Sequence, residues 1–311
     1  MNNFYFILSF SRSGSTLLAK LLNNNKDLKV LNETWIFPTL SILKWERLNY
    51  NKQRYVLHIY NESLKIYKNC KPVSHKICEK RSISFVSFYK KILKHNISIA
   101  LEKNPVNTLH FPYLKKNIEN SKFIFLTRNP IAIANSYKNR WLKNEDYNYF
   151  LFRVTTVIKT YFLSYQKYYN DPELITIRYE DLVKDPVDSL NRLCNHLGVN
   201  YDKKMLDNID DFLFKSSSLK SHKDLSKEIH VKNINKYRSQ LSKEQIQDLS
   251  YLLRDVFNFF NYPVSLTNPS QSLLKIERKV NNRLRYNKSF VKRYVRRAKY
   301  YLLYLKYTII R

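Results

Sequence analysis

Residues 6–22, FILSFSRSGSTLLAKLL, place a glycine and several hydroxyl side chains between an apolar run and a helical pattern. The glycine, Gly14, is one of only two in a chain of 311 residues. A glycine at such a junction lets backbone N–H groups turn toward an anion, and the helix N-terminus adds partial positive charge. Ser13, Ser15 and Thr16 would add hydroxyl donors, and Arg12 would reach a terminal anionic group. The segment predicts a phosphate-binding loop, with an ordinary strand-to-helix turn as the alternative.

This loop differs from the two common nucleotide-binding patterns. The GxxxxGK[ST] pattern fails because its first glycine and its lysine are missing, and no GxGxxG is present. The sequence also shows no magnesium-binding Asp after a strand. A P-loop kinase is therefore a disfavoured alternative.

A second group of anion-binding residues lies in RNPIAIANSYKNR, residues 128–140. Arg128 follows an apolar run, at the strand end where ligands bind in open α/β sheets. Ser136 and Arg140 are four residues apart and share one helix face, although Arg140 alone would also fit a solvated surface charge. Two arginines and a hydroxyl suit a second phosphate. Two phosphate-sized sites indicate a bis-phosphorylated nucleotide.

The elements that position these residues are apolar runs, each followed by a helical pattern. Strands are expected at residues 4–10, 29–33, 97–103, 122–128 and 173–179. Their alternation with helices predicts an α/β fold of three layers, P-loop-like, with a parallel sheet of about five strands between helices. Ligands would bind at the carboxyl ends of the strands.

Capping residues in the sequence predict two of the later helices. Residues 185–198 combine an N-cap Asp185, a Pro at the first helical position and Gly198 after the last turn. Residues 241–260 open with Ser242 and Gln245 at capping-box spacing and read as one long closing helix.

The predicted main domain spans residues 1–265. Within it, residues 36–96 are expected to form a mostly helical excursion between strands, the usual place for substrate-facing structure in such a sheet. Residues 266–311 form a linker and a basic C-terminal tail.

Composition indicates the class of partner. The net charge of +30 favours an anionic partner, and a basic nucleotide- or nucleic-acid-binding module is the main alternative to an enzyme. No nucleic-acid fold motif is present, so no specific nucleic acid is expected. Three cysteines provide no disulfide framework, and Cys70, His75 and Cys78 lack a fourth ligand for zinc. With no signal peptide or membrane-spanning run, the expected location is cytoplasmic, with peripheral membrane contact left open.

Taken in order, the phosphate segments resemble those of sulfotransferases that use 3′-phosphoadenosine 5′-phosphosulfate (PAPS). SRSGSTLL is similar to their 5′-phosphosulfate loop and FLTRNPIAIANSYKNR to their 3′-phosphate segment. RYEDLVKDPVDSLNRLCNHLGV is similar to the stretch that follows, which implies that Tyr179 approaches the 3′-phosphate. The resemblance covers roughly residues 4–262. It implies PAPS as donor, adenosine 3′,5′-bisphosphate as product, and no metal.

Within that family the chain is most similar to the tyrosylprotein and related glycan sulfotransferases. The similarity implies that Glu33 of NETWIFP is the general base, and that Lys103 of LEKNPVNTL and Arg12 stabilise the transferring group. The alternative for Glu33 is a positioning ion pair with Arg12 or Lys103. Pro105 stands where the cytosolic small-molecule enzymes carry a His base. The acceptor hydroxyl, on a glycan, lipid, small molecule or tyrosine, is left open.

Two segments depart from a simple match. The Arg-Lys-Gly segment of the cytosolic enzymes is missing, and its counterpart is residues 230–242, with Asn235 in place of a family Ser. The tail, residues 275–311, is strongly basic, with Glu277 as its only acid. Its apolar residues fall at amphipathic spacing, so it either lies on an anionic membrane or packs on the catalytic domain.

Overall fold

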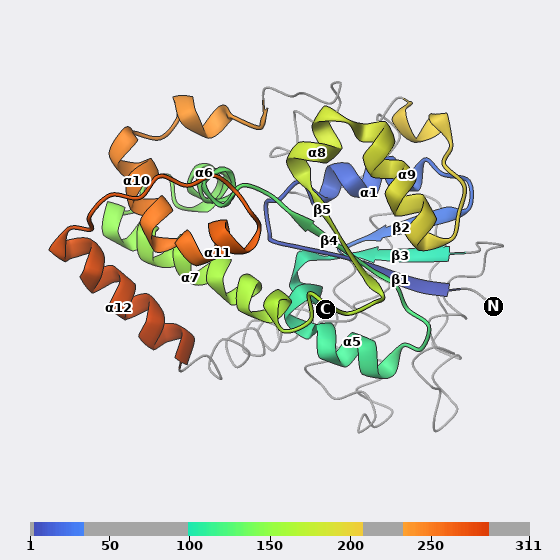
Figure 1. The fold of residues 1–311 in the computed structure, drawn as a ribbon, viewed down its shortest axis with the longest axis horizontal. Helices are drawn as coiled ribbons and strands as arrows, with labels where there is room; N and C mark the ends of the chain where they lie inside the picture. The colour runs from blue at the N-terminus through green and yellow to red at the C-terminus, as the bar shows by residue number, and fades with distance from the viewer. Residues whose placement is uncertain (1–2, 34–98, 208–232, 286–311) are drawn as a thin grey trace, which may run out of the picture.

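The computed structural model describes residues 3–33, 99–207 and 233–285 (Figure 1). This part of the chain contains a five-stranded sheet of order β2-β3-β1-β4-β5, in which every pairing is parallel. The strands are β1 (Asn3–Ser9), β2 (Leu28–Asn32), β3 (Ile99–Lys103), β4 (Phe123–Thr127) and β5 (Leu174–Arg178). The predicted fold class is confirmed, and each predicted strand lies within two residues of an observed one.

Both faces of the sheet are covered, as expected for a parallel sheet. Successive side chains of a strand point to opposite faces, so Phe4, Phe6 and Leu8 of β1 join one core while Tyr5 and Ile7 join the other. The first core is closed by α5 (Phe111–Asn117), α6 (Pro130–Trp141), α7 (Tyr147–Gln166), α10 (Lys243–Leu252), α11 (Arg254–Phe259) and α12 (Gln271–Arg285). The second is closed by α1 (Ser15–Asn23), α8 (Tyr179–Lys184) and α9 (Pro186–Leu197).

The strand order fixes where ligands can bind. β1 lies at the centre, between β3 and β4, and the chain fills one side of it with β2 and β3 before it crosses to β4 and β5. In open α/β sheets such a change of direction leaves a crevice at the carboxyl ends of the strands. The residues after β1, β2, β3 and β4 therefore meet at one edge of the sheet.

The helix predicted over residues 241–260 is wrong as a single element. The capping box at Ser242 and Gln245 is present, but the helix ends at Leu252 and α11 begins at Arg254. Leu253 adopts φ −109° and ψ 13° and is fully buried, and Asp255 of α11 lies 3.0 Å from Lys159 of α7. Packing against α7 bends the chain here, and no Gly or Pro marks the place. The helix at 185–198 is as predicted, with Asp185 as N-cap and Gly198 left-handed.

The first part of the predicted tail packs on the domain. α12 buries Leu273, Ile276 and Val280 in the core that contains α7 (Figure 1). For these residues the packed alternative is the one observed, while residues 286–311 lie outside the described part. Residues 36–96, with Cys70, His75 and Cys78, also lie outside it. Among the described helices, none is long and apolar enough to cross a membrane.

Candidate active site

The loop after β1 is built by two residues with left-handed backbone angles. Arg12 has φ 72° and Gly14 has φ 97°, and Gly14 is the N-cap of α1. The first N–H groups of a helix have no intrahelical acceptor, so those of Ser15 and Thr16 lie at the positive end of α1. Ser13 differs from the prediction, because its hydroxyl donates to the carbonyl oxygen of Phe10 over 2.8 Å and its side chain is buried. Ser13 therefore stabilises the loop.

Lys103 links this loop to the strand beside it. Its ammonium nitrogen lies 2.8 Å from Oε1 of Glu33 and donates to Oγ1 of Thr16 over 3.2 Å. The Lys103 side chain is 1% exposed, whereas that of Glu33 is 45% exposed. The structure thus brings together three of the predicted residues, with a buried cation and a carboxylate open to solvent.

The end of β2 fixes the position of Glu33. Its N–H donates to the carbonyl oxygen of Lys103 over 2.7 Å, which extends the β2–β3 pairing by one residue. Glu33 then turns with φ 50°, a left-handed angle that an L-residue adopts at some cost in energy. The β2–β3 pairing therefore ends at Glu33.

Arg12 turns toward the second predicted site. Its Nε donates to Oγ of Ser136 on α6 over 3.1 Å, and its guanidinium carbon lies 5.6 Å from the centre of the Trp141 ring. Burial lowers the pKa of Arg12, and the nearby positive charge of Arg140 lowers it further. Arg140 itself is exposed on α6. The loop and α6 therefore share one cationic region.

Arg128, directly after β4, is a buried cation whose contacts are mainly to neutral groups. Its Nη2 donates to the carbonyl oxygen of Asn233 over 2.8 Å, and its guanidinium lies 4.2 Å over the ring of Tyr179. Burial lowers the pKa of Arg128. Its Nε is buried without a hydrogen-bond acceptor, and no carboxylate in the described ranges lies within ion-pair distance of Arg128 or Arg12. Two desolvated guanidiniums without carboxylate partners suit an anionic ligand.

A buried carboxylate that no sequence pattern identified holds the residue directly after Arg128. Glu180, buried in α8, accepts the N–H of Asn129 over 2.9 Å and the hydroxyl of Tyr262 over 2.8 Å. Burial and the charge of Glu180 raise the pKa of Tyr262 well above its usual range. Asn129 in turn caps α6 by accepting from the N–H of Ile131 over 2.9 Å. The Asn-Pro pair at 129–130 signals that cap, but no local pattern identifies Glu180 as its partner.

A sequence model of the sulfotransferase family matches residues 5–203 of this chain. The matched range includes the loop, Glu33, Lys103, Arg128 and Tyr179. This chain belongs to the sulfotransferase family. The expected membership among PAPS-dependent sulfotransferases, and with it the assignment as an enzyme, is confirmed.

This sulfotransferase is similar to one protein in sequence and to two solved structures in fold. A Caenorhabditis briggsae protein named "Putative protein-tyrosine sulfotransferase" is 23% identical over 217 residues, which cover 65% of this chain and 67% of that protein. The sulfotransferase domain from the curacin biosynthetic pathway has a TM-score of 0.59 and 20% identity, covering 85% of this chain and 99% of that one. The sulfotransferase domain of the Synechococcus PCC 7002 olefin synthase has a TM-score of 0.56 and 20% identity, covering 85% and 96%. At this identity, the two structures support the fold.

Proposed function

We propose that this sulfotransferase transfers a sulfuryl group from PAPS to an acceptor hydroxyl, with Glu33 as the general base. The observation that carries the proposal is the position of the Lys103 ammonium, which contacts both Thr16 of the loop and the carboxylate of Glu33. A cation between an anion-binding loop and a solvent-accessible carboxylate is placed where negative charge and a departing proton would meet.

The donor proposal rests on the cations. Arg12 and the first N–H groups of α1 would hold the 5′ end of PAPS, and Arg128 would hold the 3′-phosphate, helped by Ser136, Arg140 and Tyr179. The buried Nε of Arg128, which has no acceptor among residues 3–33, 99–207 and 233–285, fits a phosphate oxygen as its missing partner. A nucleotide with phosphate at one end only would leave one of the two guanidiniums without a counter-charge.

The chemistry follows from what these side chains do. When bound, PAPS supplies the sulfuryl group and a bisphosphate leaving group. Glu33 would take the proton of the acceptor hydroxyl, a general-base contribution of ~10²–10⁴ in rate. Lys103 and Arg12 would stabilise the negative charge that grows on the oxygen between phosphorus and sulfur as the sulfur–oxygen bond breaks.

The variant Glu33→Gln tests the base and separates it from a positioning role. As a base, Glu33 is required for turnover, so Glu33→Gln should lower kcat by ~10² or more. The affinity for adenosine 3′,5′-bisphosphate, measured by calorimetry, should stay within about threefold because Glu33 has no place in the proposed donor site. Glu119→Gln, an exposed glutamate on the surface, serves as the matched control. Full turnover by Glu33→Gln would remove the base assignment.

The donor and the acceptor are tested by a transfer screen with labelled PAPS. Acceptors carrying a hydroxyl on a tyrosine peptide, a glycan or a lipid headgroup are offered in parallel, and sulfate incorporation is measured. The tyrosine peptide is included because of the name of the Caenorhabditis briggsae relative, and anionic glycans because of the net charge of +30. If the wild-type enzyme neither binds adenosine 3′,5′-bisphosphate nor sulfates any acceptor, the proposed function is wrong.

A further inference from the structure

The ring of Tyr179 contacts both anion-binding segments, which are more than 100 residues apart in the sequence. A Cβ atom at Gly14 would lie 2.5 Å from Cδ2 and from Cε2 of Tyr179, so only a glycine fits against the ring. On the side of β4, the guanidinium carbon of Arg128 lies 4.2 Å from the centre of the same ring. The ring of Tyr179 therefore packs against both the loop and the guanidinium of Arg128.

The ring is held in place by its own surroundings. Tyr179 is 6% exposed and is the first residue of α8, directly after β5. The next residue, Glu180, accepts the N–H of Asn129, which directly follows Arg128. Backbone and side chain thus fix the ring relative to the strand end that carries Arg128, and the contact with Gly14 fixes the loop relative to the ring.

We infer that the aromatic ring of Tyr179 is a positioning element that sets the separation between the 5′ and 3′ anion sites, and that Gly14 is required because this ring fills its Cβ position. The inference rests on the proposed use of a bis-phosphorylated donor. A ligand that engages two sites at once gains affinity from the second contact only if the distance between the sites matches the ligand. Specificity for a donor phosphorylated at both ends then depends on the ring, and the Tyr179 hydroxyl is dispensable for the spacing.

Affinities for three nucleotides separate spacing from local contacts. Adenosine 3′,5′-bisphosphate needs both sites, whereas adenosine 5′-monophosphate and adenosine 3′-monophosphate each need one. In Tyr179→Leu, adenosine 5′-monophosphate should bind within about threefold of wild type. Adenosine 3′-monophosphate should lose no more affinity than it loses in Tyr179→Phe, because apart from the Tyr179 hydroxyl each site keeps its own donors. The bisphosphate should lose about tenfold or more, because the sites no longer match it.

The conservative variant decides between ring and hydroxyl. Tyr179→Phe keeps the ring against Gly14 and Arg128, so the ratio of bisphosphate to adenosine 3′-monophosphate affinity should stay within about threefold of wild type. Tyr165→Leu controls for general damage, because Tyr165 is a buried tyrosine that stacks on Phe125 and Phe260 in the other core. That variant should lose stability and keep the affinity ratio.

A double-mutant cycle tests the contact with Gly14. Gly14→Ala carries backbone strain from φ 97° in any background, so the strain cancels when its effect is compared between wild type and Tyr179→Ala. The clash with the ring does not cancel. Gly14→Ala should therefore weaken bisphosphate binding by a factor of about 10 more in the wild-type background than in Tyr179→Ala.

Three outcomes would overturn the inference. An equal loss in Tyr179→Phe and Tyr179→Leu would assign the effect to the hydroxyl. A loss for adenosine 3′-monophosphate as large as that for the bisphosphate would confine Tyr179 to the Arg128 site. An additive cycle with Gly14 would show that the ring does not restrict the loop. The proposed function fails differently: the wild-type protein would then bind the bisphosphate no more tightly than adenosine 5′-monophosphate.

Discussion

Glu33 and Lys103 are joined twice, by a backbone hydrogen bond of 2.7 Å from N–H to carbonyl oxygen and by an ion pair of 2.8 Å between side chains. The preceding residue, Asn32, is paired with Lys103 in the β2–β3 register. The distance between the proposed base and the proposed transition-state donor is therefore set by strand pairing. Because a strand ladder is rigid, the pair is preorganised without help from the loops.

Lys103→Ala is expected to lower kcat by ~10²–10³, because it removes a preorganised donor from the position where negative charge develops. The affinity for adenosine 3′,5′-bisphosphate should change much less than kcat. Steady-state turnover with an identified acceptor and calorimetry with the bisphosphate would measure the two effects.

Lys115→Ala is a matched control for this substitution. Lys115 also forms an ion pair of 2.8 Å, with Asp171, but at the surface, where Asp171 precedes β5 at the amino ends of the strands. Its removal should leave turnover unchanged. If Lys103→Ala were as active as Lys115→Ala, Lys103 would be a structural cation that neutralises Glu33.

Arg128→Ala is expected to weaken binding of adenosine 3′,5′-bisphosphate by about 10- to 100-fold, since a buried charge-assisted contact to the 3′-phosphate is lost. Binding of adenosine 5′-monophosphate should fall by much less. Arg192→Ala, on the exposed side of α9, is the control arginine and should affect neither ligand. Equal weakening of both nucleotides by Arg128→Ala would place this arginine outside the 3′ site.

The sheet was predictable because its signals are local. Each strand of a buried parallel sheet is a continuous apolar run, and α9 carries its own capping residues, Asp185 and Gly198. Gly14 also stood out, because it lies between an apolar run and a helical pattern in a chain with only two glycines.

The remaining features depend on contacts between distant residues. The fit of Gly14 against Tyr179, the bond of Arg12 to Ser136 and the bond of Glu180 to Asn129 each join segments that only the fold brings together. The bend at Leu253 likewise follows from packing on α7, and the local sequence continues a good helical pattern through it. Spacing along the chain identifies candidates for a site but does not say which neighbour each candidate contacts.

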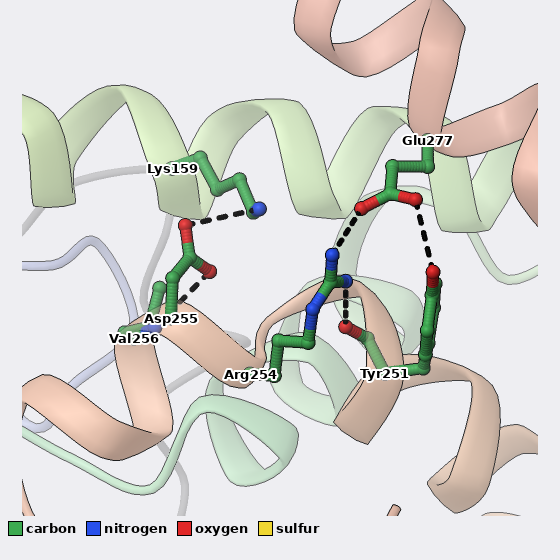
Figure 2. Close-up of polar contacts among 6 residues, drawn as sticks. All are labelled: Lys159, Tyr251, Arg254, Asp255, Val256 and Glu277. Carbon is green, nitrogen blue, oxygen red and sulfur yellow. Dashed lines mark hydrogen bonds and ion pairs between the residues drawn. The ribbon is translucent and has the colours of Figure 1, made fainter. Parts of the chain in front are cut away.

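Glu277→Ala is expected to loosen α12. Glu277 accepts from Nη2 of Arg254 over 2.7 Å and from the hydroxyl of Tyr251 over 3.1 Å, so it ties α12 to α10 and α11 (Figure 2). Its loss leaves both donors without this acceptor, at a cost of about 1 kcal/mol in the free energy of unfolding, since Arg254 is partly exposed. Amide hydrogen exchange in α12 should rise.

The neighbouring variant Arg278→Ala is the control, because Arg278 is exposed on the same helix. Exchange in α12 should be unchanged in this variant. If exchange were also unchanged in Glu277→Ala, burial of Leu273, Ile276 and Val280 alone would hold the helix.

His110 is expected to make the protein less stable in mild acid. It is the last residue of the short 3₁₀ helix Pro105–His110 and the N-cap of α5, is 8% exposed, and burial lowers its pKa to about 4. An unfolded histidine has a pKa of about 6.5, so between about pH 6.5 and pH 4 the unfolded chain binds a proton that the folded chain does not. The free energy of unfolding should therefore fall as the pH drops through this window, by up to about 3 kcal/mol from this residue.

His110→Gln lacks the titrating group, so the difference in the free energy of unfolding between wild type and variant should shrink from pH 7.5 to pH 5, as measured by urea unfolding. A difference that stays constant over this range would show that His110 is protonated equally in the two states.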